Sequence, residues 1–205
     1  MYRRHFKRWT DVVRSIFFLI LLSPLFGVLA LLIKLDSKGP VFFRQKRVGI
    51  HKTYFLIYKF RTMRMDAPVD VPTHLLRNAD QNITRLGRFL RKTSLDELPQ
   101  LLNVLKGVMS IVGPRPALWN QFDLIEMREQ VGANDVLPGL TGLAQVMGRD
   151  KLTNREKARY DGLYVRNMSF LLDMKCILRT VIKIGRGDGI VEGMQPERQK
   201  TESGQ

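Results

Sequence analysis

The chain has little of the chemistry that stabilises small secreted proteins or holds structural metals. It contains one cysteine, Cys176, so an intrachain disulfide is excluded and a reducing compartment is favoured. The histidines (His5, His51 and His74) are scattered and lack the spacing of a zinc site. The sequence therefore predicts neither a disulfide framework nor a zinc centre.

Acidic residues are also scarce, since 34 lysines and arginines face 19 aspartates and glutamates and give a formal net charge of +15. Such an excess indicates an anionic partner: a nucleic acid, an anionic lipid surface or a phosphorylated substrate. Basic residues beside a membrane segment contribute about 1 kcal/mol each to docking on an anionic leaflet. No helix-turn-helix or aromatic RNA-binding pattern is visible, so we expect no nucleic-acid partner.

No internal repeat, heptad array or alternation of strands and helices is present, which excludes a Rossmann-type fold. Extended segments are predicted at Val41–Gly49 and Thr53–Met63, and an irregular polar loop at 66–84. Glycine- and proline-rich turns are predicted at Gly113–Pro116 and Pro138–Gly142. Helices are predicted at Ile83–Arg91, Leu98–Lys106 (ended by Gly107), 117–131, Thr153–Val165 and Leu171–Ile184. The expected fold class is α+β, mainly helical, with a few short strands.

The longest apolar run, Ile16–Ile33, is short for a membrane span. As a straight helix its 18 residues extend roughly 27 Å, against a hydrocarbon core of about 30 Å. Basic clusters flank it on both sides, and such clusters tend to stay cytoplasmic. They are Arg3, Arg4, Lys7, Arg8 and Arg14 upstream, and Lys34, Lys38, Arg44, Lys46 and Arg47 downstream. A re-entrant helix-break-helix that returns to its starting face satisfies both flanks.

The Ser23-Pro24 pair supplies the break. Pro24 has no N–H, which frees a carbonyl near residue 20, and the Ser23 hydroxyl is a suitable partner for that carbonyl in hydrocarbon. A kinked spanning helix is the main alternative. A signal peptide is disfavoured because no small-residue cleavage site precedes Lys34, and a buried core helix because of the length of the run. The predicted organisation is a membrane hairpin at 1–35, a catalytic domain at 36–184 and a mobile tail at 185–205.

The densest chemistry lies between Arg88 and Pro116, centred on Ser94–Gln100. Proline is tolerated in the first turn of a helix, so Pro99 predicts a helix that starts at about Asp96. A helix start favours anions, which fits phosphate binding. Asp96 is also a good N-cap, however, and Ser94 with Glu97 matches a capping box, so the segment has a purely structural interpretation as well.

The surrounding cations favour a functional interpretation of the acidic pair. Arg88, Arg91, Lys92 and Arg115 lie near it in sequence and would keep a carboxylate ionised. An ionised aspartate in a phosphate site can act as a nucleophile. The second carboxylate would then be available for Mg²⁺, which commonly binds one or two carboxylates together with substrate phosphates.

Several ordered motifs resemble the monotopic polyprenol-phosphate phosphoglycosyltransferases, bacterial sugar transferases that start glycoconjugate synthesis on a lipid carrier. The resemblance covers nearly the whole chain, from the hairpin break to Leu172-Asp173. The matching segments are Ser23-Pro24, Tyr58–Met63, Ser94–Gln100, Gly113–Pro116 and Pro138–Val146. One departure is Met147, which stands before Gly148 where the family often has asparagine, and this affects expectations for substrate contacts there.

The resemblance implies a two-step reaction at the cytoplasmic face of the bacterial inner membrane. Asp96 would attack the sugar-bearing phosphate of a UDP-sugar and release UMP, and undecaprenyl phosphate would then take the phosphosugar. Glu97 would bind Mg²⁺. Contacts to substrate phosphate are expected from Lys59, Arg88, Arg91, Arg115 and Arg149.

Sequence leaves the sugar, the base, the glycoconjugate pathway (exopolysaccharide or lipopolysaccharide) and homodimer formation open. The alternative function is a non-enzymatic, membrane-anchored basic protein that binds anionic lipid or nucleic acid. That alternative explains the charge and the hairpin, but not the acidic pair beside Pro99.

Overall fold

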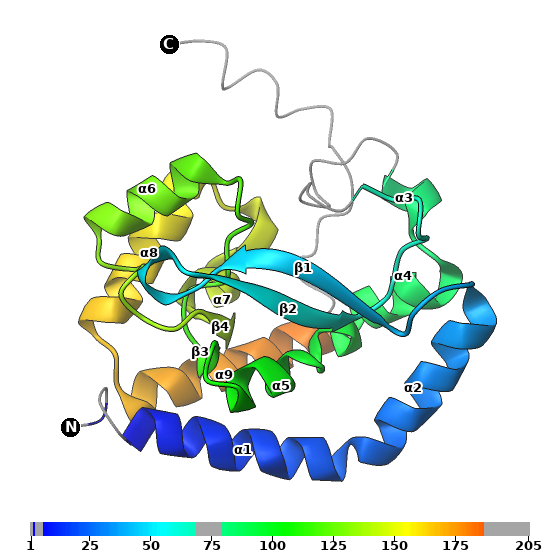
Figure 1. Ribbon diagram of the computed structural model, residues 1–205. Helices are drawn as coiled ribbons and strands as arrows, with labels where there is room; N and C mark the ends of the chain where they lie inside the picture. The colour runs from blue at the N-terminus through cyan, green and yellow to red at the C-terminus, as the bar shows by residue number, and fades with distance from the viewer. Residues whose placement is uncertain (1, 3–5, 69–78, 187–205) are drawn as a thin grey trace.

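The computed structural model describes residue 2 and residues 6–68 and 79–186 (Figure 1). This part of the chain is mainly helical with two small sheets, which confirms the α+β class. The polar loop predicted at 66–84 lies partly outside the described residues, and its last part forms a short helix, α3 (Ala79–Asn82). The predicted tail lies outside them from residue 187 onward.

The N-terminal segment is a bent pair of helices, α1 (Lys7–Leu21) and α2 (Ser23–Asp36), whose axes differ by 62°. Within the described ranges no single helix has the length and composition of a membrane span, whereas this bent pair does. The Ser23 hydroxyl donates a hydrogen bond to the Ile20 carbonyl at 2.8 Å, so the predicted partner for the freed carbonyl is confirmed. Arg8 and Arg14, which precede the apolar run in the sequence, are part of α1.

The polar side of α1 faces the protein. Lys7, Asp11 and Ser15 are buried, while the large apolar side chains of the same helix are exposed. Those exposed side chains are Trp9, Val13, Ile16, Phe17, Phe18, Ile20 and Leu21. A helix on the surface of a water-soluble domain has the opposite arrangement.

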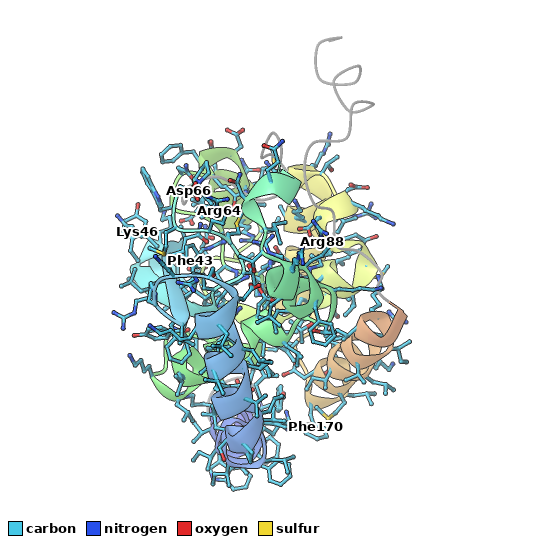
Figure 2. All side chains as sticks on the ribbon, turned by 90° about the vertical axis from the view of Figure 1, so that its right-hand side faces the viewer. Phe43, Lys46, Arg64, Asp66, Arg88 and Phe170 are labelled. Atoms are coloured by element: carbon cyan, nitrogen blue, oxygen red, sulfur yellow. The ribbon has the colours of Figure 1, made fainter. Side chains whose placement is uncertain are left out.

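A buried polar network attaches α1 to the rest of the domain. The Lys7 ammonium donates to Asp173 Oδ2 at 2.6 Å, and the Tyr164 hydroxyl donates to Asp173 Oδ1 at 2.8 Å. The Ser110 hydroxyl donates to Asp11 Oδ2 at 2.6 Å. Phe170, which is labelled in Figure 2, starts α9 (Phe170–Arg186). The guanidinium of α1 residue Arg14 lies over its ring, 5.5 Å from the centroid.

The first sheet is an antiparallel ribbon of β1 (Phe42–Val48) and β2 (Tyr54–Phe60), joined through a short 3₁₀ turn, η2 (Ile50–Lys52). Both strands were predicted from sequence and are confirmed. Phe43 pairs with Lys59, which places Phe43, Gln45 and Arg47 on the same face of the ribbon as Lys59, because side chains alternate along a strand.

The second sheet was not predicted. Its strands are β3 (Ser110–Val112) and β4 (Gly139–Thr141), which pair in parallel. The prediction of a simple turn at Pro138–Gly142 is therefore wrong, because a three-residue strand leaves too short a pattern to recognise. The backbone segments of these two strands approach so closely that a Cβ on Gly139 would lie 2.1 Å from the backbone nitrogen of Gly113.

The remaining helices pack around the two sheets (Figure 1). They are α4 (Arg85–Lys92), α5 (Gln100–Leu105), α6 (Phe122–Gln130), α7 (Leu143–Met147), α8 (Asn154–Arg166) and α9, with 3₁₀ turns η4 (Leu95–Glu97) and η5 (Arg149–Lys151). Helix α6 begins later than the predicted 117–131. Gly107 ends α5 with a φ of +83°, as predicted. The largest group of buried apolar side chains includes Val104, Met109 and Val112, with Tyr164 packed among them.

Candidate active site

Asp96 and Glu97 lie on the one-turn helix η4, between α4 and α5, and each is only 7% exposed. The turn is set up by Ser94, whose φ of +55° reverses the chain after α4. The predicted helix start at Asp96 is wrong in its boundary, because the α-helix begins at Gln100 with Pro99 as its N-cap residue. Proline there leaves no N–H unsatisfied, and the three residues Leu95–Glu97 form a separate 3₁₀ turn before it.

The capping interpretation of the acidic pair is also wrong. The Ser94 side chain makes no capping hydrogen bond, and the Glu97 carboxylate is held by basic side chains instead. Arg115 donates to both carboxylate oxygens, at 2.6 Å to Oε1 and 3.3 Å to Oε2. The Lys59 ammonium donates to Oε1 at 2.9 Å, and Arg149 Nη2 lies 3.6 Å from the same oxygen.

These contacts fix the charge of Glu97. Burial alone would raise the pKa of its carboxyl, but Arg115, Lys59 and Arg149 outweigh burial and hold the pKa well below its usual range. Glu97 is therefore an anion that keeps three cations converged on one point of the active site.

Asp96 has a different environment although it is the adjacent residue. Its Oδ2 lies 3.8 Å from the Lys59 ammonium, with the charges of Arg91 and Arg149 also nearby. Burial raises the pKa of Asp96 and the anionic Glu97 raises it further, while Lys59 opposes the rise. A carboxylate that is poorly solvated and only loosely paired is a better nucleophile than one held by short hydrogen bonds.

A hydrogen bond to Thr62 positions the Arg91 side chain. Its Nε donates to the Thr62 hydroxyl at 2.8 Å, which directs the guanidinium toward the acidic pair. Thr62 is itself buried, and its backbone carbonyl accepts a hydrogen bond from the N–H of Thr84, the N-cap residue of α4. The segment just after β2 and the N-cap of α4 therefore fix this cation together.

The acidic pair opens into a cavity of about 670 Å³, here called the main cavity. Four predicted phosphate contacts line it: Lys59, Arg91, Arg115 and Arg149. The structure does not bring the fifth, Arg88, to the cavity, since Arg88 is exposed and projects from the upper side of α4 in Figure 2. Residues 88 and 91 are close in sequence, but only the second faces the acidic pair.

Arg47 is one of the basic residues lining the main cavity that sequence analysis did not predict as part of the site. It lines the main cavity from β1 and donates to the Pro116 carbonyl at 3.0 Å and, through Nε, to Gln45 Oε1 at 3.1 Å. Burial, together with the charge of Arg115, lowers the pKa of Arg47 to about 9. The period-two pattern of the strand places Arg47 on one face with Gln45, but only the pairing of β1 with β2 shows that Lys59 shares that face.

The carboxylates of Asp96 and Glu97 fit a Mg²⁺ ion that takes its other ligands from the substrate and from water. No cluster of three or more aspartate, glutamate, histidine or cysteine side chains occurs among the residues that the structure describes, so a complete protein-only metal cage is not formed there. Asp96 and Glu97 instead offer two adjacent carboxylates in a cavity lined with cations, which fits an ion that completes its coordination with substrate phosphates and water.

A family comparison identifies the chain. The model of the bacterial sugar transferase family matches residues 2–187, which is most of the sequence. The chain belongs to the bacterial sugar transferase family. The predicted family resemblance is confirmed, and because this is a family of enzymes the non-enzymatic alternative is wrong.

Individual relatives of this sugar transferase agree. It is 42% identical over 184 residues to the uncharacterized sugar transferase EpsL of Bacillus subtilis (strain 168), covering 90% of this chain and 89% of the relative. It is 44% identical over 195 residues to the exopolysaccharide production protein PSS of Rhizobium leguminosarum bv. phaseoli, covering 89% and 97%.

A longer relative has a more informative name. The sugar transferase is 44% identical over 185 residues to the UDP-glucose:undecaprenyl-phosphate glucose-1-phosphate transferase of Klebsiella pneumoniae. The match covers 87% of this chain but 40% of the Klebsiella protein, so the chain spans about two fifths of that relative's length.

Proposed function

We propose that this sugar transferase moves a phosphosugar from a UDP-sugar to undecaprenyl phosphate and releases UMP. The observation that carries the proposal is the buried Asp96–Glu97 pair with Lys59, Arg91, Arg115 and Arg149 around it. Relatives named for UDP-glucose and for UDP-N-acetylgalactosamine both name undecaprenyl phosphate as acceptor, which supports the reaction class and leaves the sugar open.

In the first step Asp96 Oδ attacks the sugar-bearing phosphorus. The bond between that phosphorus and the oxygen bridging to the UMP phosphate breaks, and UMP leaves with the electron pair. A phosphosugar remains joined to Asp96 as an acyl phosphate. The raised pKa of Asp96 and its single long contact with Lys59, at 3.8 Å, support its role as the attacking group.

In the second step an oxygen of the lipid phosphate attacks the same phosphorus. The bond to Asp96 breaks, the aspartate carboxylate is regenerated and a lipid-linked diphosphosugar forms. In both steps the phosphoryl oxygens carry negative charge, and fixed cations that face these oxygens lower the barrier without reorganising.

Glu97 has two roles in this proposal. It holds Lys59, Arg115 and Arg149 in place, and together with Asp96 it would hold Mg²⁺. The ion would neutralise phosphate charge. Arg115 then exchanges part of its contact with Glu97 for a phosphate oxygen, a ligand that its planar guanidinium fits equally well.

The decisive experiment measures UMP release by the purified chain in nanodiscs with undecaprenyl phosphate, Mg²⁺ and a panel of UDP-sugars. Asp96→Asn should abolish release with every sugar, while Asp135→Asn, an exposed aspartate paired with His51, should leave it unchanged. Intact-mass detection of a phosphosugar adduct on the wild type, absent from Asp96→Asn, identifies the intermediate. Full activity in Asp96→Asn would overturn the assignment of the nucleophile.

The N-terminal hairpin is proposed to enter the membrane and return to the cytoplasmic face of the inner membrane. The outward apolar side of α1, the 62° bend at Ser23-Pro24 and the net charge of +15 support this topology. The test uses Phe6→Cys and Lys38→Cys in a Cys176→Ser background, labelled in spheroplasts with a membrane-impermeant maleimide. Both positions should stay unlabelled until the cells are lysed. Labelling of residue 6 alone would establish a spanning helix.

A further inference from the structure

A second cavity of about 200 Å³, here called the α9 cavity, lies between η4 and the C-terminal half of α9. Its apolar wall comes from Leu98, Ile177, Val181 and Ile184, and two lysines also line it, Lys92 and Lys183. Its volume is below the usual size of a site for a whole small-molecule ligand, so it suits one end of a longer molecule.

The α9 cavity adjoins the catalytic centre. Glu97, Arg115 and Arg149 line both this cavity and the main cavity, so the cluster of charges around the acidic pair forms a shared wall. A lipid phosphate bound in the α9 cavity would therefore lie beside these three charges, and it would pass them into the main cavity to reach the phosphosugar on Asp96 from the side that UMP has left. Asp96 lines the main cavity and not the α9 cavity, so the two cavities share the charged residues beside the attacking group and not that group itself. Two cavities that adjoin in this way suit a reaction with two substrates.

The outer side of the α9 cavity continues into an apolar surface. Val181 is 63% exposed and Ile184 36% exposed although both line the cavity, and Leu178, on the same helix, is also exposed. In Figure 2, α9 lies below α4, which carries Lys92 at its end. An apolar chain that leaves the cavity would therefore run along an apolar helix face.

We propose that the α9 cavity binds the phosphate end and the first isoprene units of the polyprenyl phosphate acceptor. Lys92 and Lys183 contact the lipid phosphate, and Leu98, Ile177, Val181 and Ile184 contact the isoprenoid chain. The UDP-sugar occupies the larger, more polar main cavity. This assignment rests on the proposed function and adds to it a place and a set of residues for the second substrate.

The test separates the kinetics of the two substrates. Val181→Arg puts a charge on the apolar wall, and Ile182→Arg puts the same charge on an exposed neighbour that does not line the cavity. Val181→Arg should raise KM for undecaprenyl phosphate by about tenfold, the scale of one spoiled apolar contact in a binding site, and leave KM for the UDP-sugar unchanged. Lys183→Gln should act in the same direction, with Lys175→Gln, exposed on the same helix, as its control.

Binding is also measured without any variant. Wild-type protein is irradiated with farnesyl phosphate that carries a diazirine on its terminal isoprene, and the labelled peptides are identified by mass spectrometry. Label within residues 177–184 supports the proposal, and label confined to other segments overturns it.

The two hypotheses fail differently. If the wild type transfers no phosphosugar from any UDP-sugar, the proposed function is wrong. If the wild type is active and Val181→Arg changes KM for the UDP-sugar alone, or affects acceptor KM no more than Ile182→Arg does, the function stands and the acceptor site is wrong.

Discussion

Arg115 holds Glu97 by both carboxylate oxygens, at 2.6 and 3.3 Å, although the two residues are 18 positions apart in the chain. The pairing joins the turn that carries the acidic pair to the rigid segment after β3. Arg115 also gains from the contact, because burial would lower its pKa and Glu97 more than reverses that effect. Each side chain therefore keeps the other charged.

Replacing this guanidinium should impair catalysis more than folding. Arg115→Gln removes a cation that faces the transferred phosphate, and we expect kcat/KM for the UDP-sugar to fall by about 100-fold. Arg115→Lys keeps the charge but loses the bidentate contact with Glu97, so its kcat/KM should lie between those of the wild type and Arg115→Gln. Steady-state UMP release measures both. Lys52→Gln, which breaks an exposed pair with Glu129, should change nothing, and an Arg115→Gln enzyme as active as this control would contradict the role.

The pH dependence of the reaction should follow Asp96. Attack requires the ionised carboxylate, so kcat/KM should fall as the pH drops through a pKa that burial has raised above the usual aspartate range. Lys59 lowers that pKa, so Lys59→Met should raise it further and move the acid limb of the profile to higher pH. Lys59→Arg retains the positive charge and should keep the limb near its original position. A limb that moves to lower pH in Lys59→Met would contradict this electrostatic assignment.

Thr62 is expected to act through Arg91. Thr62→Val keeps the shape of the buried side chain but removes the acceptor for Arg91 Nε, so we expect KM for the UDP-sugar to rise several-fold, the effect of one lost hydrogen bond. Thr62→Ser restores the acceptor and should restore KM, a rescue that a purely structural defect would not show. Equal KM values for the valine and serine variants would rule out positioning by this hydroxyl.

Gly87 is expected to contribute to the stability of the fold. A Cβ on Gly87 would lie 2.0 Å from the Thr62 carbonyl oxygen, so the start of α4 would have to move away from β2. We expect Gly87→Ala to cost about 1–3 kcal/mol of stability or more, as overpacking does, and thermal unfolding in detergent measures it. Gly27→Ala is the control, since nothing lies within 4 Å of a Cβ there and alanine favours a helix. An unchanged midpoint in Gly87→Ala would contradict the close contact.

Local sequence patterns predicted the features that depend on near neighbours. The break at Ser23-Pro24, the two strands of the ribbon and the helix ended by Gly107 each follow from a few adjacent residues, and all three are confirmed. The boundary at Asp96 was wrong because Pro99 suits both the first turn of a helix and its N-cap position. Tertiary contacts with Lys59 and Arg115 then decide which conformation the acidic pair adopts.

The contacts that complete the site depend on residues far apart in sequence. Arg47 reaches the site through the register of β1 with β2, and the parallel pairing of β3 with β4 depends on a close approach at Gly113 and Gly139. Neither leaves a periodic signal. Arg88 and Arg91 make the same point on a single helix. The two arginines are three residues apart on α4, yet only Arg91 lines the main cavity.

The buried network of Lys7, Asp173 and Tyr164 has a consequence for where the reaction occurs. Sliding α1 along α9 would separate a buried ammonium from its carboxylate, which is strongly unfavourable. The two helices therefore keep a constant register. In the proposed membrane topology, the depth of α1 in the lipid would also set the depth of Asp96. The hairpin would then hold the proposed nucleophile at one fixed depth, and a lipid phosphate would have to reach that depth to react.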